Sequence, residues 1–197
     1  LDVPVAALLG QETHSQGKDW VDLKANLWKD GWKTIGAPAV SAHSCGASAS
    51  VRKSYNTGLT QGAKEDCSPR ESPGRLSSAW VDGIVRDGLL ILSIYLWHGE
   101  GFTDRTWALL YAAGVVIKRH GGPWVLGGDF QNPPDELYYE MWDWLKSVGG
   151  EVCAPGNVTC KSAHGGRTID YFIIDSRISH GVRGIWTQMD FPSSPHY

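Results

Sequence analysis

Apolar runs and turn-forming residues alternate along the chain and predict interleaved strands and helices. Residues 5–11 are mostly apolar and end in polar side chains, which indicates a buried strand. A helical stripe follows, formed by Trp20, Leu23, Leu27 and Trp28. We expect this helix to be capped by Asp19 and stopped by Gly31. Residues 47–55 alternate as a strand does, and the Gly-, Ser- and Pro-rich residues 56–75 predict a loop with solvated charges.

The second half of the chain continues in the same manner. Two antiparallel strands are predicted within residues 76–97, joined near Asp87-Gly88, because Asp-Gly between apolar runs is a strong hairpin signal. The other predicted elements are a helix over 103–120 ended by Gly121, a strand over 124–130, a helix over 135–148, and strands over 167–176 and 184–190.

This order of elements predicts the α/β (α+β) class. The hairpin means that the sheet cannot be all parallel, and sheets sandwiched between helices fit the order best. The chain has 197 residues, of which 42% are hydrophobic and 20% charged, so we expect one globular domain over residues 1–197. The chain starts at Leu1 and stops within a motif at Tyr197, so we expect this domain to be truncated at both ends.

Charge and cysteine content exclude some functions. With 18 Lys+Arg against 21 Asp+Glu, the net charge of −3 gives no general attraction to nucleic acid, although a bound cation would supply local positive charge. The four cysteines contain no C-x-x-C pair, which argues against a zinc site. A bridge between Cys153 and Cys160 is left open. No apolar run reaches membrane-spanning length.

Three acidic residues stand within or directly after apolar strands: Glu12, Asp129 and Asp170. A carboxylate in such a place is costly unless a partner compensates its charge. A hard cation such as Mg²⁺ would be one partner, because it prefers oxygen ligands. An Arg, Lys or backbone partner would be another, and for any single acid this simpler interpretation is favoured.

Five segments, taken together and in order, resemble the endonuclease/exonuclease/phosphatase superfamily. They are QETH at 11–14, SIYLWHGEG at 93–101, LGGDFQNPPDEL at 126–137, TIDYFIID at 168–175 and SPHY at 194–197. The resemblance is greatest to the divergent retroelement-associated type. It implies a four-layer α/β/β/α sandwich of two mixed sheets packed face to face with helices outside, here lacking the terminal strands. It also implies hydrolysis of a phosphodiester, with DNA as the favoured substrate and Mg²⁺ or Mn²⁺ as cofactor.

The resemblance assigns roles position by position. It implies that Glu12 binds the metal, that Tyr95 faces the scissile phosphate and that Asp129 orients or deprotonates the attacking water. Asp170 would hydrogen-bond the catalytic histidine, His196. Gln131 and His98 stand where the family has asparagines, and both become candidates for substrate contact.

Two further residues are candidates for substrate binding, and each also has a simpler structural interpretation. Trp97 could stack on a substrate or pack in the core, and Arg167 could reach a phosphate or form a surface salt bridge. His98, likewise, could be an ordinary surface histidine.

One departure from the family pattern affects activity. The family ends in S-D-H, whereas this chain has Ser194-Pro195-His196, so an acidic group is replaced by proline. Loss of one acid–base group commonly lowers a rate by about 10²- to 10⁴-fold. The alternative function is therefore a weakened or inactive relative that serves as a binding or structural subunit of a larger assembly. The compartment is left open by the sequence, with an intracellular and, for a retroelement-type endonuclease, nuclear location favoured.

Overall fold

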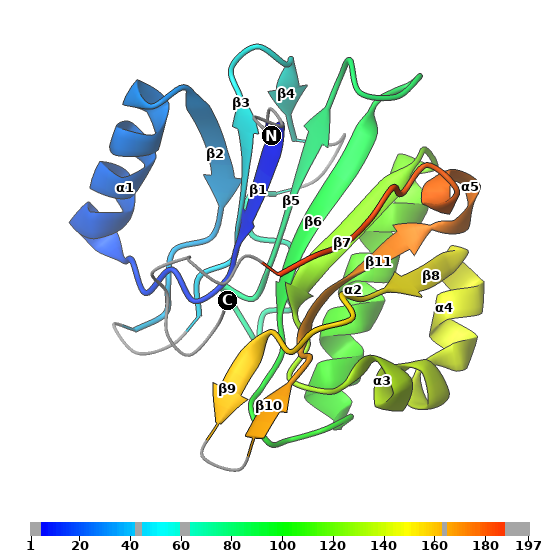
Figure 1. The fold of residues 1–197 in the computed structure, drawn as a ribbon. Coiled ribbons are helices and arrows are strands. Elements are labelled where there is room, and N and C mark those ends of the chain that lie inside the picture. The colour runs from blue at the N-terminus through cyan, green and yellow to red at the C-terminus, as the bar shows by residue number, and fades with distance from the viewer. Residues whose placement is uncertain (1–4, 42–44, 60–63, 163–164, 188–197) are drawn as a thin grey trace.

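Two facing β-sheets with helices on their outer sides form the four layers of the molecule (Figure 1). The computed structural model describes residues 5–41, 45–59, 64–162 and 165–187. The α/β sandwich of two sheets predicted from the sequence is confirmed. Within the described residues, no helix combines the length and apolarity that spanning a membrane requires.

The smaller sheet contains three antiparallel strands in the order β1-β3-β2. These are β1 (Ala7–Gly10), β2 (Trp32–Gly36) and β3 (Ser48–Arg52). Helix α1 (Gly17–Lys29) covers the outer side of this sheet next to β2 (Figure 1). It begins after Gln16, and Asp19 lies in its first turn instead of at the predicted cap.

The larger sheet has six strands in the order β4-β5-β6-β7-β11-β8. Its strands are β4 (Thr57–Gly58), β5 (Leu76–Val81), β6 (Leu89–Tyr95), β7 (Trp124–Asp129), β8 (Gly150–Cys153) and β11 (Asp170–Asp175). Neighbouring strands are antiparallel except for β6 and β7, which are parallel. The predicted hairpin is confirmed as β5 and β6, with both Asp87 and Gly88 at positive φ. A separate antiparallel pair, β9 (Cys160–Ser162) and β10 (Gly165–Arg167), projects beyond one end of the sheets (Figure 1).

Helices α2 (Asp104–His120), α3 (Pro134–Glu140) and α4 (Trp142–Val148) cover the outer side of the larger sheet, and the short α5 (Ser176–Ser179) follows β11 (Figure 1). The glycine predicted to end α2, Gly121, adopts a left-handed conformation at its C-cap. The helix predicted over 135–148 is divided in two at Met141, whose φ of −108° and ψ of 15° interrupt the helical backbone.

Two apolar cores separate the layers. One lies between the larger sheet and α2–α4 and includes Leu92, Leu110, Trp124 and Trp144. The other lies between the two sheets and is built mainly from smaller side chains such as Ala49, Val51, Ala79 and Ile91. Every residue of β6 is buried, which explains why it reads as a continuous apolar run without alternation.

Several sequence expectations were wrong or incomplete. The chain at 184–187 is not a strand, and residues 188–190 of that predicted element lie outside the described residues. Arg75, expected on a solvated loop, is only 8% exposed. Strands β2, β4, β8, β9 and β10 were not predicted, and β4 lies within the residues that were predicted to form a loop. All four cysteines are free thiols, which resolves the open question of a bridge between Cys153 and Cys160.

Candidate active site

Three of the predicted site residues form one row across the larger sheet. Tyr95 on β6 is paired with Asp129 on β7, which is in turn paired with Asp170 on β11. The row lies at the ends of β6 and β7 and at the start of β11, because β11 runs antiparallel to β7. Residues directly opposite each other on adjacent strands have neighbouring side chains. The sequence positions 95, 129 and 170 are therefore brought together by strand register.

Glu12 reaches this row from the smaller sheet. It follows β1 and has a positive φ of 51°, and the hydroxyl of Tyr95 donates a hydrogen bond to its Oε1. The side-chain amide of Gln11 donates to Ser93 Oγ at 2.8 Å, and Ser93 Oγ donates to the carbonyl of Gly10 at 3.0 Å. These bonds join the end of β1 to β6, so the two sheets meet at Glu12 and Tyr95.

Asp129 is almost completely buried, with 2% of its surface exposed. Its Oδ1 accepts the backbone N–H of Gln131 at 3.0 Å, and its Oδ2 accepts the side-chain amide of the same residue at 2.6 Å. Gln131 can hold both oxygens because its backbone turns back with a φ of 58°. The carbonyl end of its amide, Oε1, lies 2.8 Å from Nδ1 of His98. Gln131 and His98, predicted to contact substrate, thus form a chain of contacts that ends at Asp129.

Asp170 is positioned by Thr159, a residue that sequence reasoning missed. The hydroxyl oxygen of Thr159 accepts the backbone N–H groups of both Ile169 and Asp170 at 3.0 Å. Thr159 is 3% exposed and lies just before β9, where no apolar pattern marks an element. Thr159 lies between Cys153 and Cys160, and nothing in the sequence around it indicates that its hydroxyl contacts the backbone at Asp170.

The charges of Glu12 and Asp129 both act on Tyr95. The pKa of Tyr95 is raised, first by burial and then by its hydrogen bond with Glu12 and by the charges of Glu12 and Asp129. The hydroxyl of Tyr95 therefore stays protonated and remains a donor to Glu12.

All three acids affect the pKa of the Cys160 thiol at the start of β9. Its pKa is raised by burial and by the charges of Asp170, Asp129 and Glu12, while Arg167 lowers it. Glu12, Asp129 and Asp170 thus lie within electrostatic range of one side chain. Strand register and the hydrogen bond between Tyr95 and Glu12 likewise place these three acids near one another.

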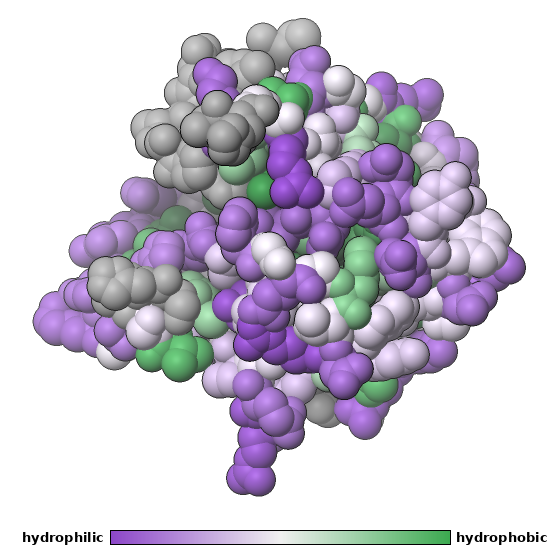
Figure 2. Space-filling model, turned by 90° about the horizontal axis from the view of Figure 1, so that it is seen from below, coloured by the Kyte–Doolittle hydropathy of each residue, from purple (hydrophilic) through white to green (hydrophobic). Residues whose placement is uncertain are grey.

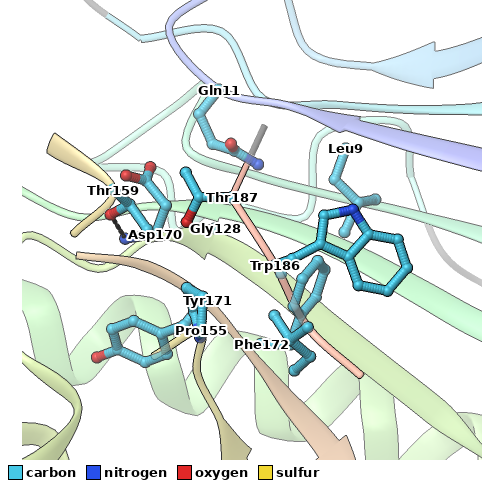
Figure 3. A pocket seen from close by; sticks show the side chains of 12 residues that line it. Leu9, Gln11, Gly128, Pro155, Thr159, Asp170, Tyr171, Phe172, Trp186 and Thr187 are labelled. Carbon is cyan, nitrogen blue, oxygen red and sulfur yellow. Dashed lines mark hydrogen bonds between the residues drawn. The ribbon is translucent and has the colours of Figure 1, made fainter. Parts of the chain in front are cut away.

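A cavity of about 300 Å³ opens next to Asp170, between the two sheets (Figure 3). Gln11 enters it from the β1 side, while Asp170 and Thr159 lie across from it, and Leu9, Phe172 and Trp186 form an apolar part. Gly127 and Gly128 line it without side chains. A Cβ at Gly127 would come within 2.6 Å of Leu9 Cδ1, so this glycine allows the two sheets to approach closely, whereas a Cβ at Gly128 would meet Ile94 on the neighbouring strand β6.

The remaining predicted residues differ in their surroundings. Arg167 lies on the exposed β10, close enough to Cys160 for its charge to act there. Trp97 packs against the helix-side core, and the guanidinium groups of Arg75 and Arg105 lie 4.3 and 4.6 Å from its ring centroid. His196 and Pro195 lie outside the described residues.

Arg75 is a structural neighbour of the site that was not predicted. Its guanidinium group donates to the carbonyls of Tyr95 and Leu96, both at 3.1 Å, and lies 4.6 Å from the Tyr95 ring centroid. A buried cation with two carbonyl acceptors fixes the end of β6. Its charge also lowers the pKa of Tyr95, against the larger effects that raise it.

The donor atoms at the site fit a hard divalent cation. Oxygen atoms from Glu12 and its surroundings are the ligands that Mg²⁺ prefers. Among the described residues, no group of three or more His, Cys, Asp or Glu side chains is arranged to hold a metal.

Comparisons with known proteins agree on the architecture. No family model and no curated protein matches this sequence. Among solved structures, the endonuclease domain of TRAS1, a telomere-specific non-LTR retrotransposon, aligns with a TM-score of 0.63 and 13% identity, covering 98% of this chain and 95% of that one. ANGEL2, a 2′,3′-cyclic phosphatase, aligns with a TM-score of 0.60 and 12% identity over 87% of this chain and 70% of its own.

A third similar structure is described by the name of its protein family. An endonuclease/exonuclease/phosphatase family protein from Leptotrichia buccalis C-1013-b aligns with a TM-score of 0.53 and 13% identity, covering 86% of this chain and 75% of that chain. At such identities the likeness concerns the fold. The sandwich of two sheets and its outer helices is that of the endonuclease/exonuclease/phosphatase proteins.

Proposed function

We propose that this protein is a divalent-metal-dependent phosphodiesterase, and that it acts as an endonuclease on nucleic acid, with DNA favoured. The observation that carries the proposal is the proximity of Glu12, Asp129 and Asp170: Asp129 is paired with Asp170 and with Tyr95 by strand register, and the Tyr95 hydroxyl donates to Glu12. Neighbouring carboxylates of this kind can hold a hard cation or take part in proton transfer. The endonuclease and phosphatase names of the similar structures support the same class of reaction.

Each acid would have a different task. Glu12 would hold the cation, because it stands at the seam between the sheets with the Tyr95 hydroxyl on its Oε1. The cation, when bound, would neutralise charge on the phosphoryl oxygens. Asp129 would orient the attacking water and accept its proton, since residue 131 already fixes both carboxylate oxygens.

The row of strand ends would also position the substrate. Tyr95, held as a protonated hydroxyl, would face the scissile phosphate from β6. His196 would hydrogen-bond a non-bridging phosphoryl oxygen, with Asp170 as the carboxylate that fixes its tautomer and favours its charged form. Arg167 would add positive charge on the β10 side of the site, where its charge already acts on Cys160.

The character of the surface agrees with a polar polymer as substrate. Seen from the end of the molecule where β9 and β10 project, the surface is mainly hydrophilic, with apolar residues in small separate spots (Figure 2). A net charge of −3 gives little attraction for phosphates over long range. We therefore expect substrate binding to depend strongly on the divalent cation, which would supply the positive charge that the protein lacks.

The proposal is tested by nicking of supercoiled plasmid DNA in the presence of Mg²⁺. Wild-type protein should convert the plasmid to the open circle, whereas EDTA should abolish the reaction. Glu12→Ala and His196→Ala should each lower the rate by at least about 10²-fold. Lys118→Ala on the outer helix α2 serves as a matched control and should nick as the wild type does.

Two results would contradict the proposal. If the wild type and both variants nicked at equal rates, the activity would come from a contaminant or from other residues. If none nicked DNA, RNA or a simple phosphodiester with either Mg²⁺ or Mn²⁺, the inactive binding subunit would be the better description.

A further inference from the structure

We infer that His98 is a positioning residue, which is held in its Nδ1–H tautomer and orients Asp129 through the side chain of Gln131. The inference deepens the proposed function and rests on it for the role of Asp129. It begins from two contacts, one of 2.6 Å between Gln131 Nε2 and Asp129 Oδ2 and one of 2.8 Å between Gln131 Oε1 and His98 Nδ1.

The direction of each hydrogen bond follows from the chemistry of Asp129. A carboxylate accepts hydrogen bonds and donates none, so the amide nitrogen of Gln131 must be the atom that faces it. The other end of the amide, Oε1, then faces His98. Because an amide oxygen also only accepts, Nδ1 of His98 must carry the proton. Asp129 thus determines which ring nitrogen of His98 is protonated.

The burial of Asp129 and Gln131 explains why this arrangement is firm at one end. Asp129 and Gln131 are 2% and 8% exposed, so water has little access to their mutual bonds. A buried amide that lost either partner would leave a polar group unsatisfied, which is costly. His98 is exposed and completes the set from the surface.

Gln131 needs both its length and its backbone conformation for this task. With a φ of 58°, its backbone N–H faces Asp129 Oδ1 while its side chain bends back to Oδ2. A left-handed conformation is unfavourable for a residue with a side chain, so the two bonds to Asp129 must offset its cost. Asparagine, shorter by one methylene, could not hold Asp129 and His98 in the same way.

The first experiment needs no catalytic activity. Two-bond ¹H–¹⁵N correlation spectra of the ¹⁵N-labelled protein distinguish the two neutral tautomers of each histidine. In the wild type, neutral His98 should show the Nδ1–H pattern. In Gln131→Ala it should lose this pattern and become a mixture dominated by Nε2–H, while the exposed His180 should be unchanged. An Nε2–H pattern for His98 in the wild type would overturn the inference even if the protein proved to be an active nuclease.

The second experiment separates positioning from substrate contact by a double-mutant cycle in steady-state cleavage of an oligonucleotide. His98→Ala should lower kcat by about 10-fold and leave KM within about 2-fold, because one hydrogen bond to the positioning amide is lost. His98→Asn, which places an amide donor where Nδ1 was, should recover most of that loss. In a Gln131→Ala background, His98→Ala should have no further effect.

A different kinetic result would contradict the positioning role. If His98→Ala raised KM and its effect multiplied with that of Gln131→Ala, His98 would act on the substrate directly and the positioning role would be wrong. If the wild type showed no cleavage, the proposed function would fail, whereas the tautomer measurement would still decide the contact between His98 and Gln131.

Discussion

The two strand ends that supply Asp129 and Glu12 are held in very different ways. At the end of β7, Asp129 is buried, and both of its carboxylate oxygens accept bonds from residue 131. At the end of β1, Glu12 is partly exposed and accepts a bond from the Tyr95 hydroxyl of the other sheet. One carboxylate is thus fixed within a sheet, whereas the other lies at the seam between two sheets.

This difference suits two different chemical tasks. A group that orients water must keep one geometry, because small displacements of reacting atoms cost much of the rate. A group that binds a hydrated cation gains from exposure, because Mg²⁺ keeps several of its waters. The larger sheet would therefore supply the fixed base, and the smaller sheet the ligand.

The largest expected effect separates these two carboxylates by metal dependence. Asp129→Asn should lower kcat by about 10³-fold at every Mg²⁺ concentration, because the proton acceptor is lost. Glu12→Gln should lower the rate by about 10²-fold at low Mg²⁺ and recover part of it as Mg²⁺ is raised, because a ligand is weakened. Initial cleavage rates over a Mg²⁺ titration measure both. If the cleavage rates of both variants recovered equally as Mg²⁺ was raised, the proposed difference between Asp129 as base and Glu12 as metal ligand would be wrong.

A smaller effect, on stability, tests how firmly each strand end is held. A Cβ at Gly128 would lie 2.1 Å from the backbone oxygen of Ile94 on β6, whereas a Cβ at Gly10 on β1 would lie 2.7 Å from the movable Ser48 Oγ. Gly128→Ala should thus cost about 3 kcal/mol of unfolding free energy, and Gly10→Ala about 1 kcal/mol or less. Urea unfolding followed by circular dichroism compares the two, and equal costs would contradict the difference in rigidity.

The smallest effect uses Cys160 as a probe of the charge at both ends. Its pKa is raised by burial and by the three acids, so little thiolate is present at neutral pH and alkylation should be slow. Mg²⁺ bound at Glu12 would offset the negative charge and lower this pKa, so more thiolate would form. The rate of iodoacetamide labelling should therefore rise by about 3-fold with Mg²⁺.

Two controls make the labelling specific. Cys153, whose pKa is raised by burial and by Glu151, should label at the same rate with and without Mg²⁺. Glu12→Gln should remove the acceleration at Cys160. Peptide mass spectrometry resolves the two cysteines in one sample. An equal Mg²⁺ effect at Cys153 would indicate a general change in the protein instead of binding at the seam.

Long strands and their carboxylates could be predicted from the sequence, because their pattern is set by burial. The apolar runs before Tyr95 and Asp129 are strands that are covered on both sides, and strand register then aligns Tyr95, Asp129 and Asp170. The close approach between the sheets at Gly127 could not be predicted, because it depends on Leu9, which is distant in the sequence.

Contacts that depend on backbone conformation could not be predicted. The hold of Gln131 on Asp129 requires a positive φ, which the residue type disfavours. Strands β9 and β10 are short, and β10 is exposed, so they lack apolar alternation, and Thr159 beside them carries no sequence signal. The burial of Arg75 arises from two carbonyls at the end of a distant strand, about which the loop composition around it says nothing.

The central claim is that a divalent cation binds at Glu12, where the two sheets meet. Anomalous diffraction from crystals soaked in Mn²⁺ tests it directly. The account predicts a peak within about 2.5 Å of a Glu12 carboxylate oxygen in the wild type and its absence in Glu12→Ala. The claim would be contradicted if well-ordered wild-type crystals showed no anomalous peak near Glu12, or if the peak persisted in Glu12→Ala.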